Sequence, residues 1–255
     1  MAKTPPPPEE KRKPCRKRLI LSATSKGGCG KSYTCVQMIE WLLNHPTRPR
    51  VKAFDPDFEN LTLTNYHRDV TTFVDVDRTN DMDKPLIALC DDVADVAVVD
   101  GLGSQQRKTF QGWVDEINLF EIRDSVPGGL DITYVHMVEE DVDILEQAAN
   151  LLQLVGDKVQ WLFVRNLKNA PSTELWTKSM ARELAMKFGA KEITMAKLWK
   201  EGALLANSER MPLNRAANIE GLFIADKQRF ITATRAVNAE FERVATMLLP
   251  TPLKE

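Results

Sequence analysis

The sequence lacks the features of membrane proteins and of disulfide-stabilised proteins. No apolar run approaches the ~20 residues that a membrane-spanning helix needs. Residues 1–18 lack the apolar segment of a secretion signal. The four cysteines show no C-x-x-C spacing, which favours reduced thiols. We therefore expect a cytoplasmic protein with no stable membrane insertion.

The charge is close to balanced overall but unevenly distributed. The chain has 34 Lys and Arg residues against 36 Asp and Glu, a net charge of −2, so the whole chain has no strong attraction to nucleic acid. Residues 1–18, by contrast, hold seven Lys and Arg against Glu9 and Glu10, together with four consecutive prolines. Such a segment cannot bury a core, and its composition predicts a disordered basic arm over residues 1–18.

Residues 19–250 are enough for one large domain, since 43% of the 255 residues are hydrophobic. Short apolar segments alternate with segments of helical periodicity, which predicts a mostly parallel, twisted α/β sheet flanked by helices. Glycines 128 and 129 mark a turn, and residues 197–221 fit neither period. The expected strands are 19–23, 51–54, 93–99, 132–138 and 159–164, and the expected helices are 31–44, 106–120, 139–155, 172–187 and 228–248.

The stretch 22–35, SATSKGGCGKSYTC, has the layout of a phosphate-binding loop. It lies between a predicted strand and a predicted helix, and its glycines allow several backbone N–H groups to converge on one anion. The helix that follows adds its positive N-terminal end. In such a loop Lys31 would reach the β- and γ-phosphates of a nucleotide, and the Ser32 hydroxyl would bind Mg²⁺. The alternative is an ordinary glycine-rich turn before a helix.

The loop departs from the standard pattern G-x-x-x-x-G-K-[ST] at its first position. Ser25 replaces the glycine, and Lys26 follows it. With this extra lysine, the run SKGGCGKS resembles the altered phosphate loop of the ParA/MinD family of ATPases. The resemblance implies a P-loop NTPase fold and an ATP-dependent homodimer, in which Lys26 reaches the partner's nucleotide. A cation there would stabilise charge on the transferred phosphoryl group.

Two acidic segments fit the same resemblance. The run FDPDFENLT places Asp55 and Asp57 at the end of a predicted strand, where carboxylates can hold a magnesium-bound water or orient the attacking water. Asn60 completes a segment similar to one in the family. The run DVAVVDGLGS brings Asp100 to the end of another strand, like a Walker B aspartate that contacts Mg²⁺ through water, although its Gly-Leu-Gly departs from the family's pattern. A turn and a solvent-facing strand end are the alternatives.

Asn166 follows a further predicted strand, in WLFVRNLKN, where family members use an asparagine against adenine. A GTPase would more often show Asn-Lys-x-Asp, which is missing here, so ATP is favoured; a turn asparagine is the alternative. We predict ATP and Mg²⁺ as cofactors. The catalytic assignments are Lys26, Lys31, Asp55 and Asp57; the nucleotide contacts are Gly27, Gly28, Cys29, Gly30, Lys31, Ser32, Tyr33 and Asn166; and the magnesium contacts are Ser32, Asp55 and Asp100.

Within the family, the spacing in FDPDFENLT and VVDGLGS resembles the TraL/StbB-like plasmid partition and conjugation subgroup. This resemblance implies a weakly hydrolysing switch that positions or segregates cargo through non-specific DNA binding and a stimulating partner protein. DNA binding needs basic side chains that face phosphates. The candidates are an arm set, Lys11, Arg12, Lys13, Arg16, Lys17 and Arg18, and a late set, Lys178, Arg182, Lys187, Lys191, Lys197 and Lys200. For both sets a solvated surface is the alternative.

Other functions of this superfamily fit the sequence less well. A membrane-cycling protein needs a terminal amphipathic basic helix, but the end of this sequence is short and broken by proline. A cluster-bridging electron carrier needs cysteines beyond the Asp100 segment, and none occurs after Cys90. A metabolic ligase or amidase-type ATPase that activates a small carboxylate remains the alternative, although it would not need Lys26. A nucleotide switch that barely hydrolyses ATP also remains open.

Overall fold

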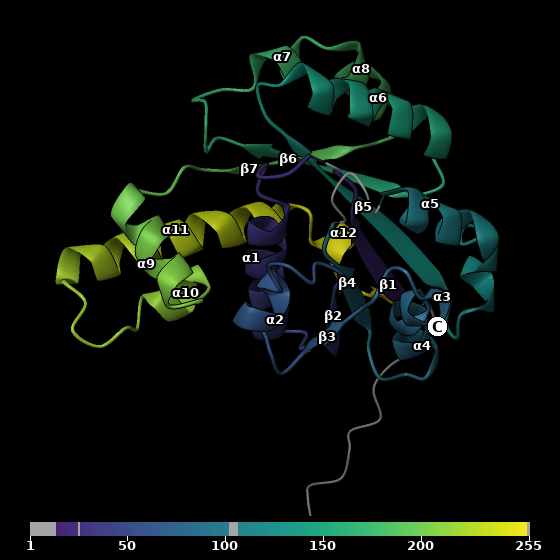
Figure 1. The fold of residues 1–255 in the computed structure, drawn as a ribbon, viewed down its shortest axis with the longest axis horizontal. Coiled ribbons are helices and arrows are strands. Elements are labelled where there is room, and N and C mark those ends of the chain that lie inside the picture. Colours follow the sequence, from purple (N-terminus) through teal and green to yellow (C-terminus); the bar gives the residue numbers. More distant parts are fainter. Residues whose placement is uncertain (1–13, 25, 102–106, 254–255) are drawn as a thin grey trace, which may run out of the picture.

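One sheet organises the chain, and its strands come from most parts of the sequence (Figure 1). The computed structural model describes residues 14–24, 26–101 and 107–253. Within these ranges eight strands form one sheet, in the order β3-β2-β4-β1-β5-β6-β7, with β8 paired to the start of β1. The strands are β1 (Cys15–Ser22), β2 (Val51–Asp55), β3 (Thr71–Phe73), β4 (Val96–Val99), β5 (Leu130–Val138), β6 (Gln160–Asn166), β7 (Lys191–Met195) and β8 (Thr251–Pro252).

Strands β1 to β7 pair in parallel, and β8 is antiparallel to β1. Parallel neighbours need long crossover connections, which the helices between successive strands provide. The predicted single-domain α/β architecture with a mostly parallel sheet is therefore confirmed.

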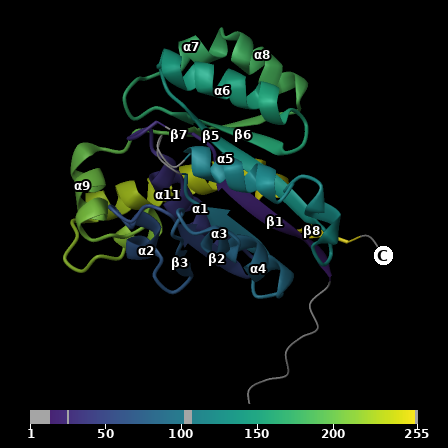
Figure 2. The same ribbon diagram turned by 45° about the vertical axis from the view of Figure 1, so that its right-hand side comes forward.

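Two layers of helices cover the sheet. Side chains alternate along β1, so that Leu19 and Leu21 join one buried cluster and Ile20 the other. Both views keep α6, α7 and α8 on one side and α1, α9 and α11 on the other (Figures 1 and 2). One layer contains α1 (Lys31–Asn44), α2 (Thr62–Tyr66), α9 (Lys200–Ser208), α10 (Leu213–Ala216), α11 (Ile224–Arg243) and α12 (Ala245–Leu248); the other contains α3 (Thr79–Met82), α4 (Lys84–Cys90), α5 (Arg107–Glu116), α6 (Val142–Val155), α7 (Glu174–Thr177) and α8 (Met180–Lys187).

The first strand begins at Cys15, four residues earlier than predicted, so the prediction of a disordered arm through residue 18 is wrong at its end. Lys17 is buried against Asp95, with its Nζ 3.0 Å from Oδ1. Arg18 is fully buried and donates to the Thr246 carbonyl at 2.9 Å. These two basic residues therefore join the sheet because their acidic and carbonyl partners lie far along the chain. The composition of residues 1–18 could not reveal such distant partners. Residues 1–13 of the predicted arm lie outside the described residues.

Several boundaries also differ from the predictions. The strand predicted over 93–99 begins at Val96, and the helix predicted over 139–155 begins at Val142. The helix predicted over 172–187 is divided into α7 and α8, because the Ser179 hydroxyl caps a new helix by accepting from Arg182 N. The short strands β3, β7 and β8 were not predicted, and the ambiguous region 197–221 contains α9 and α10. Residue 106 of a predicted helix is outside the described ranges.

Because the strands are parallel, the carboxyl ends of β1, β2, β4 and β6 share one edge of the sheet. The phosphate loop, Asp55, Asp100 and Asn166 all occupy this edge. In the described ranges no helix combines the length and the hydropathy that crossing a membrane requires.

Candidate nucleotide-binding site

The phosphate loop connects β1 to α1, as the sequence predicts. Gly28 and Gly30 have φ angles of 75° and 93°, in the left-handed region that favours glycine. Helix α1 begins at Lys31, so its N-terminal end faces the loop. The strand, the tight glycine turn and the helix N-terminus together form a suitable cradle for phosphate. Ser25, at the position of the missing glycine, lies outside the described residues.

Lys31 lies within this cradle and is 8% exposed. Its Nζ donates to the Lys26 carbonyl at 2.6 Å, so its hydrogen bond goes to a neutral group. Its aliphatic part runs against Gly101, where an added Cβ would stand 2.7 Å from Lys31 Cδ. Glycine at 101 therefore has a physical reason: it leaves room for the lysine side chain that the loop presents.

Two buried carboxylates stand beside Lys31. Asp100 is 2% exposed and accepts a hydrogen bond from Gly101 N at 2.7 Å, and the Ser32 hydroxyl also bonds to it. Burial, with a smaller contribution from the nearby charge of Asp55, raises the pKa of Asp100 to about 6. Asp55 is fully buried, accepts from Thr64 N at 3.0 Å, and also has a pKa raised by burial. Two adjacent buried acids favour a cation between them.

The donor set of this corner fits Mg²⁺. The Ser32 hydroxyl and the carboxylates of Asp55 and Asp100 offer the oxygen ligands that this ion prefers. The described residues contain no cluster of three or more His, Cys, Asp or Glu side chains that could hold a metal by themselves. The arrangement thus matches an ion held by one or two carboxylates together with nucleotide phosphates, which is how Mg²⁺ usually binds in such sites.

Asp57 forms a turn directly after β2. Its Oδ1 accepts from Glu59 N and Asn60 N, each at 3.1 Å, and its Oδ2 accepts from Asn60 Nδ2 at 2.9 Å. The turn that the sequence allowed as an alternative is present, and the Asp57 backbone N donates to Asp55 Oδ1 at 3.2 Å. A role for Asp57 in catalysis remains a prediction.

Lys26 lies on the rim of the loop, where its Nζ forms an ion pair with Asp141. The side chains are 34% and 27% exposed, respectively. The hydrogen bond to Asp141 raises the pKa of the Lys26 ammonium. Asp141 is also the N-cap of α6 and accepts from Ile144 N at 3.2 Å. The distinctive lysine is therefore held by a carboxylate of its own chain.

The remaining predicted nucleotide contacts lie in the loop or next to it. Cys29 is buried, with its Sγ 3.2 Å from the Lys26 carbonyl oxygen, and burial raises the pKa of its thiol. Tyr33 packs against the cluster on the α1 face. Asn166, at the end of β6, bonds to the loop backbone. Gly27 is open, with no atom within 4 Å of an added Cβ.

Sequence reasoning missed three residues that hold the site. Thr64 anchors Asp55, Asp141 pairs with Lys26, and Glu139 accepts from Asn166 Nδ2 at 3.3 Å. Asp141 could have been found as an N-cap, since an aspartate directly precedes the apolar period of α6. The other two contacts depend on three-dimensional proximity.

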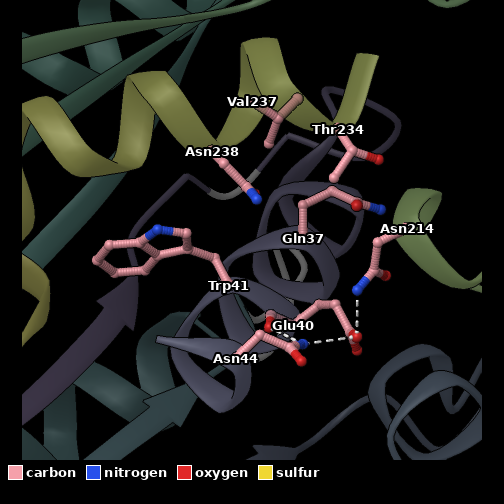
Figure 3. A pocket seen from close by; sticks show the side chains of 8 residues that line it. All are labelled: Gln37, Glu40, Trp41, Asn44, Asn214, Thr234, Val237 and Asn238. Atoms are coloured by element: carbon pink, nitrogen blue, oxygen red, sulfur yellow. Dashed lines mark hydrogen bonds between the residues drawn. The ribbon is translucent and has the colours of Figure 1, made fainter. Parts of the chain in front are cut away.

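A separate polar cavity lies between α1, α10 and α11 (Figure 3). Its volume of about 20 Å³ leaves room for water but not for a nucleotide. Glu40 projects into it from α1 and accepts from Asn214 Nδ2 at 2.7 Å and from Asn44 Nδ2 at 2.9 Å. Arg215 balances its charge at 2.6 Å. Among the described residues, Asn214 Oδ1 and Thr234 Oγ1 of this lining are buried without a hydrogen-bond partner. The cavity is too small for a nucleotide, which leaves the loop corner as the candidate site.

Comparisons with known proteins bear on the fold. No protein-family model matches the chain, and no curated protein does either. Among solved structures it is similar to the MinD cell division protein of Aquifex aeolicus, with 15% identity over 94% of this chain and 100% of that one, at a TM-score of 0.53. The MinC:MinD cell division protein complex from Aquifex aeolicus gives 14% identity, 94% and 99% coverage, and a TM-score of 0.51. A ParA family ATPase from Chlorobium tepidum gives 14% identity, 86% and 99% coverage, and a TM-score of 0.46.

The sheet and its loop define an α/β fold of the P-loop class. More narrowly, the chain has the ParA/MinD-like fold, as the first two likenesses show. At such low identity they establish the fold alone, and the TraL/StbB-like subgroup stays a prediction.

The buried charge of Asp100 should make the protein less stable at higher pH when nucleotide and metal are absent. Its pKa is raised from 3.8 to about 6, so the folded state holds a proton that the unfolded state loses. The stability contribution is fully present below pH 3.8 and disappears as pH rises through about 6. Asp100→Asn should therefore be more stable than wild type at pH 8, by about 2 kcal/mol, and lose this advantage toward pH 4.

Urea unfolding in EDTA at several pH values measures this difference. Asp91→Asn, at an exposed aspartate, is the control and should show no such trend. An equal difference between Asp100→Asn and wild type at pH 4 and pH 8 would contradict a raised Asp100 pKa.

Proposed function

We propose that this protein is a Mg²⁺- and ATP-dependent dimeric switch that hydrolyses ATP slowly and positions or segregates cargo. One observation carries the proposal. Lys31, Ser32, Asp55 and Asp100 meet at the carboxyl edge of the sheet, with Lys26 beside them on the loop rim. Plasmid DNA or a protein complex is the proposed cargo.

Each residue of the corner has a chemical task in this proposal. The N–H groups of the glycine loop and the end of α1 bind phosphate oxygens, and Lys31 neutralises the β- and γ-phosphates. Ser32, Asp55 and Asp100 hold the metal, which supplies charge neutralisation when it is bound. Asp55 or Asp57 orients the attacking water. The burial of Lys31 and both acids keeps these interactions in a weakly screened environment.

Lys26 favours a switch over a metabolic ligase. A ligase would complete its chemistry within one chain, whereas Lys26 stands on the exposed rim, where a second subunit could meet it. We propose that ATP closes a homodimer in which Lys26 leaves Asp141 and reaches the partner's nucleotide. A partner protein would then stimulate hydrolysis. The likeness to a MinD structure that contains MinC supports a protein partner, though not its identity.

Non-specific DNA binding requires exposed basic side chains on the nucleotide side. Arg16 and Lys17 are paired with aspartates and Arg18 is buried, so these three members of the arm set are occupied. The late set is divided by β7. The exposed Lys187 and Lys191 precede or begin the strand, at the edge opposite the loop. The exposed Lys197 and Lys200 follow it, on the loop's edge. We propose that the latter two contact DNA.

The experiment measures binding to non-specific duplex DNA with ATP and with ADP across a salt series. We expect the protein to bind DNA with ATP but not with ADP. The logarithm of the DNA affinity should fall by about 0.9 per neutralised phosphate for each unit in the logarithm of salt concentration. Replacing Lys197 and Lys200 with alanine should reduce that slope by up to about 2. The same change at Lys187 and Lys191 is the matched control and should leave the slope unchanged.

Equal loss of binding in both double variants would contradict the placement of the DNA surface. Binding that is absent with ATP and with ADP would contradict DNA as the track. A screen for small carboxylate substrates would then test the metabolic alternative.

A further inference from the structure

Asn166 ends β6 beside the phosphate loop, and protein atoms occupy all its polar groups. The residue is 8% exposed. Its Nδ2 donates to the Cys29 carbonyl at 2.8 Å and to Glu139 Oε1 at 3.3 Å. Its Oδ1 accepts from Lys168 N at 3.0 Å. An asparagine amide has two donor hydrogens, and both are therefore engaged.

The contact with the loop is close as well as polar. An added Cβ at Gly30 would stand 2.5 Å from Asn166 Nδ2, so the amide lies directly against the loop backbone. Gly30 has a φ of 93°, and its carbonyl accepts from Thr34 N at 2.9 Å in the first turn of α1. The carbonyl that Asn166 holds thus belongs to the residue just before this turn. Fixing it fixes the direction in which the loop's N–H groups point.

A supporting contact holds Asn166 in this orientation. Glu139 follows β5, the strand next to β6, and its carboxylate also accepts from Asn169 Nδ2 at 3.4 Å. Turning the amide toward a base would leave the Cys29 carbonyl and Glu139 without this donor. Breaking buried hydrogen bonds costs more than an exposed base contact returns.

We infer that Asn166 is a positioning residue that fixes the phosphate loop through the Cys29 carbonyl, and that it does not read the nucleotide base. The inference rests on the proposed nucleotide function. It revises the expectation that Asn166 contacts adenine, and it assigns to the β5 and β6 ends a role in shaping the phosphate cradle. We call the hydrogen bond from Asn166 to the Cys29 carbonyl the clamp. Its loss affects every ligand that carries a triphosphate, whatever its base.

The test compares the affinities of ATP, GTP and inorganic tripolyphosphate for wild type and Asn166→Ala. Tripolyphosphate has no base, so it reports the cradle alone. Asn166→Ala should weaken all three ligands by the same factor, about 10-fold, which corresponds to one lost hydrogen bond. Asn218→Ala, at an exposed asparagine, is the control and should leave all three affinities unchanged.

A loss confined to ATP, with tripolyphosphate affinity unchanged, would show a base contact and overturn the inference. A lower melting temperature with unchanged affinities would show a role in folding alone and would overturn it too. If Asn166→Ala does not fold, Glu139→Gln is the second variant, which keeps an acceptor oxygen for Asn166. A uniform loss of about 3-fold supports the clamp, and a loss for ATP alone contradicts it. A wild-type protein that binds none of the three ligands would overturn the proposed function itself.

Discussion

Lys31→Ala is expected to weaken ATP binding by about 100-fold or more, because it removes the main cation of the cradle. The Lys31 ammonium donates to the neutral Lys26 carbonyl at 2.6 Å, so little must be broken before it can turn to phosphate. Charge-assisted hydrogen bonds are each stronger than neutral ones by about twofold, and Lys31 would make them to two phosphates. Calorimetry with ATP and Mg²⁺ measures the loss.

The design of this experiment separates loss of charge from loss of fold. Lys227→Ala removes an exposed lysine on α11 and should leave ATP affinity unchanged. Because Lys31 packs along Gly101, a methionine at 31 keeps most of the apolar contact while it removes the charge. Lys31→Met should therefore lose affinity as fully as Lys31→Ala. Unchanged ATP affinity in either variant would contradict the assignment of residues 22–35 as a phosphate loop.

Local patterns predicted the parts of the site that lie close together in sequence. The loop stands between one short strand and one helix, so spacing alone placed Gly28 and Gly30 correctly between β1 and α1, and Lys31 at the start of α1. Asp55 ends β2 and Asp100 follows β4, and the parallel topology brings both to the loop's edge. Prediction worked here because a parallel sheet places the ends of its strands together without further information.

Long-range pairings explain what could not be predicted. Arg18 belongs to a strand because Thr246 and Leu249, more than 200 residues later, accept its hydrogen bonds. Strand β3 has only three residues, which is too short for an alternating pattern to show. The contact of Lys26 with Asp141 spans 115 positions. The sequence identified Lys26 as unusual, but its partner depends on how the end of β5 meets the loop.

The ion pair of Lys26 changes how the altered loop is understood. A lysine that acts only in a dimer would hinder nucleotide binding to the monomer if its ammonium group occupied the phosphate site. Asp141 holds it on the rim, while Lys31 points into the cradle. The two lysines of one loop thus have separate positions. This separation agrees with separate tasks, one in nucleotide binding and one in dimer formation, and the tasks can be tested apart.

Lys26→Ala should leave ATP affinity within about 3-fold of wild type, abolish the ATP-dependent dimer and lower hydrolysis by about 100-fold or more. Light scattering with ATP measures the dimer, and phosphate release measures hydrolysis.

Asp141→Asn is the matched variant, because asparagine can still cap α6 toward Ile144 while it no longer carries the charge that holds Lys26. It should dimerise at lower ATP concentrations than wild type. If the ion pair merely stabilised the loop, Lys26→Ala and Asp141→Asn would change dimerisation in the same direction. An ATP-dependent dimer of normal stability in Lys26→Ala would contradict the role of Lys26 across the interface.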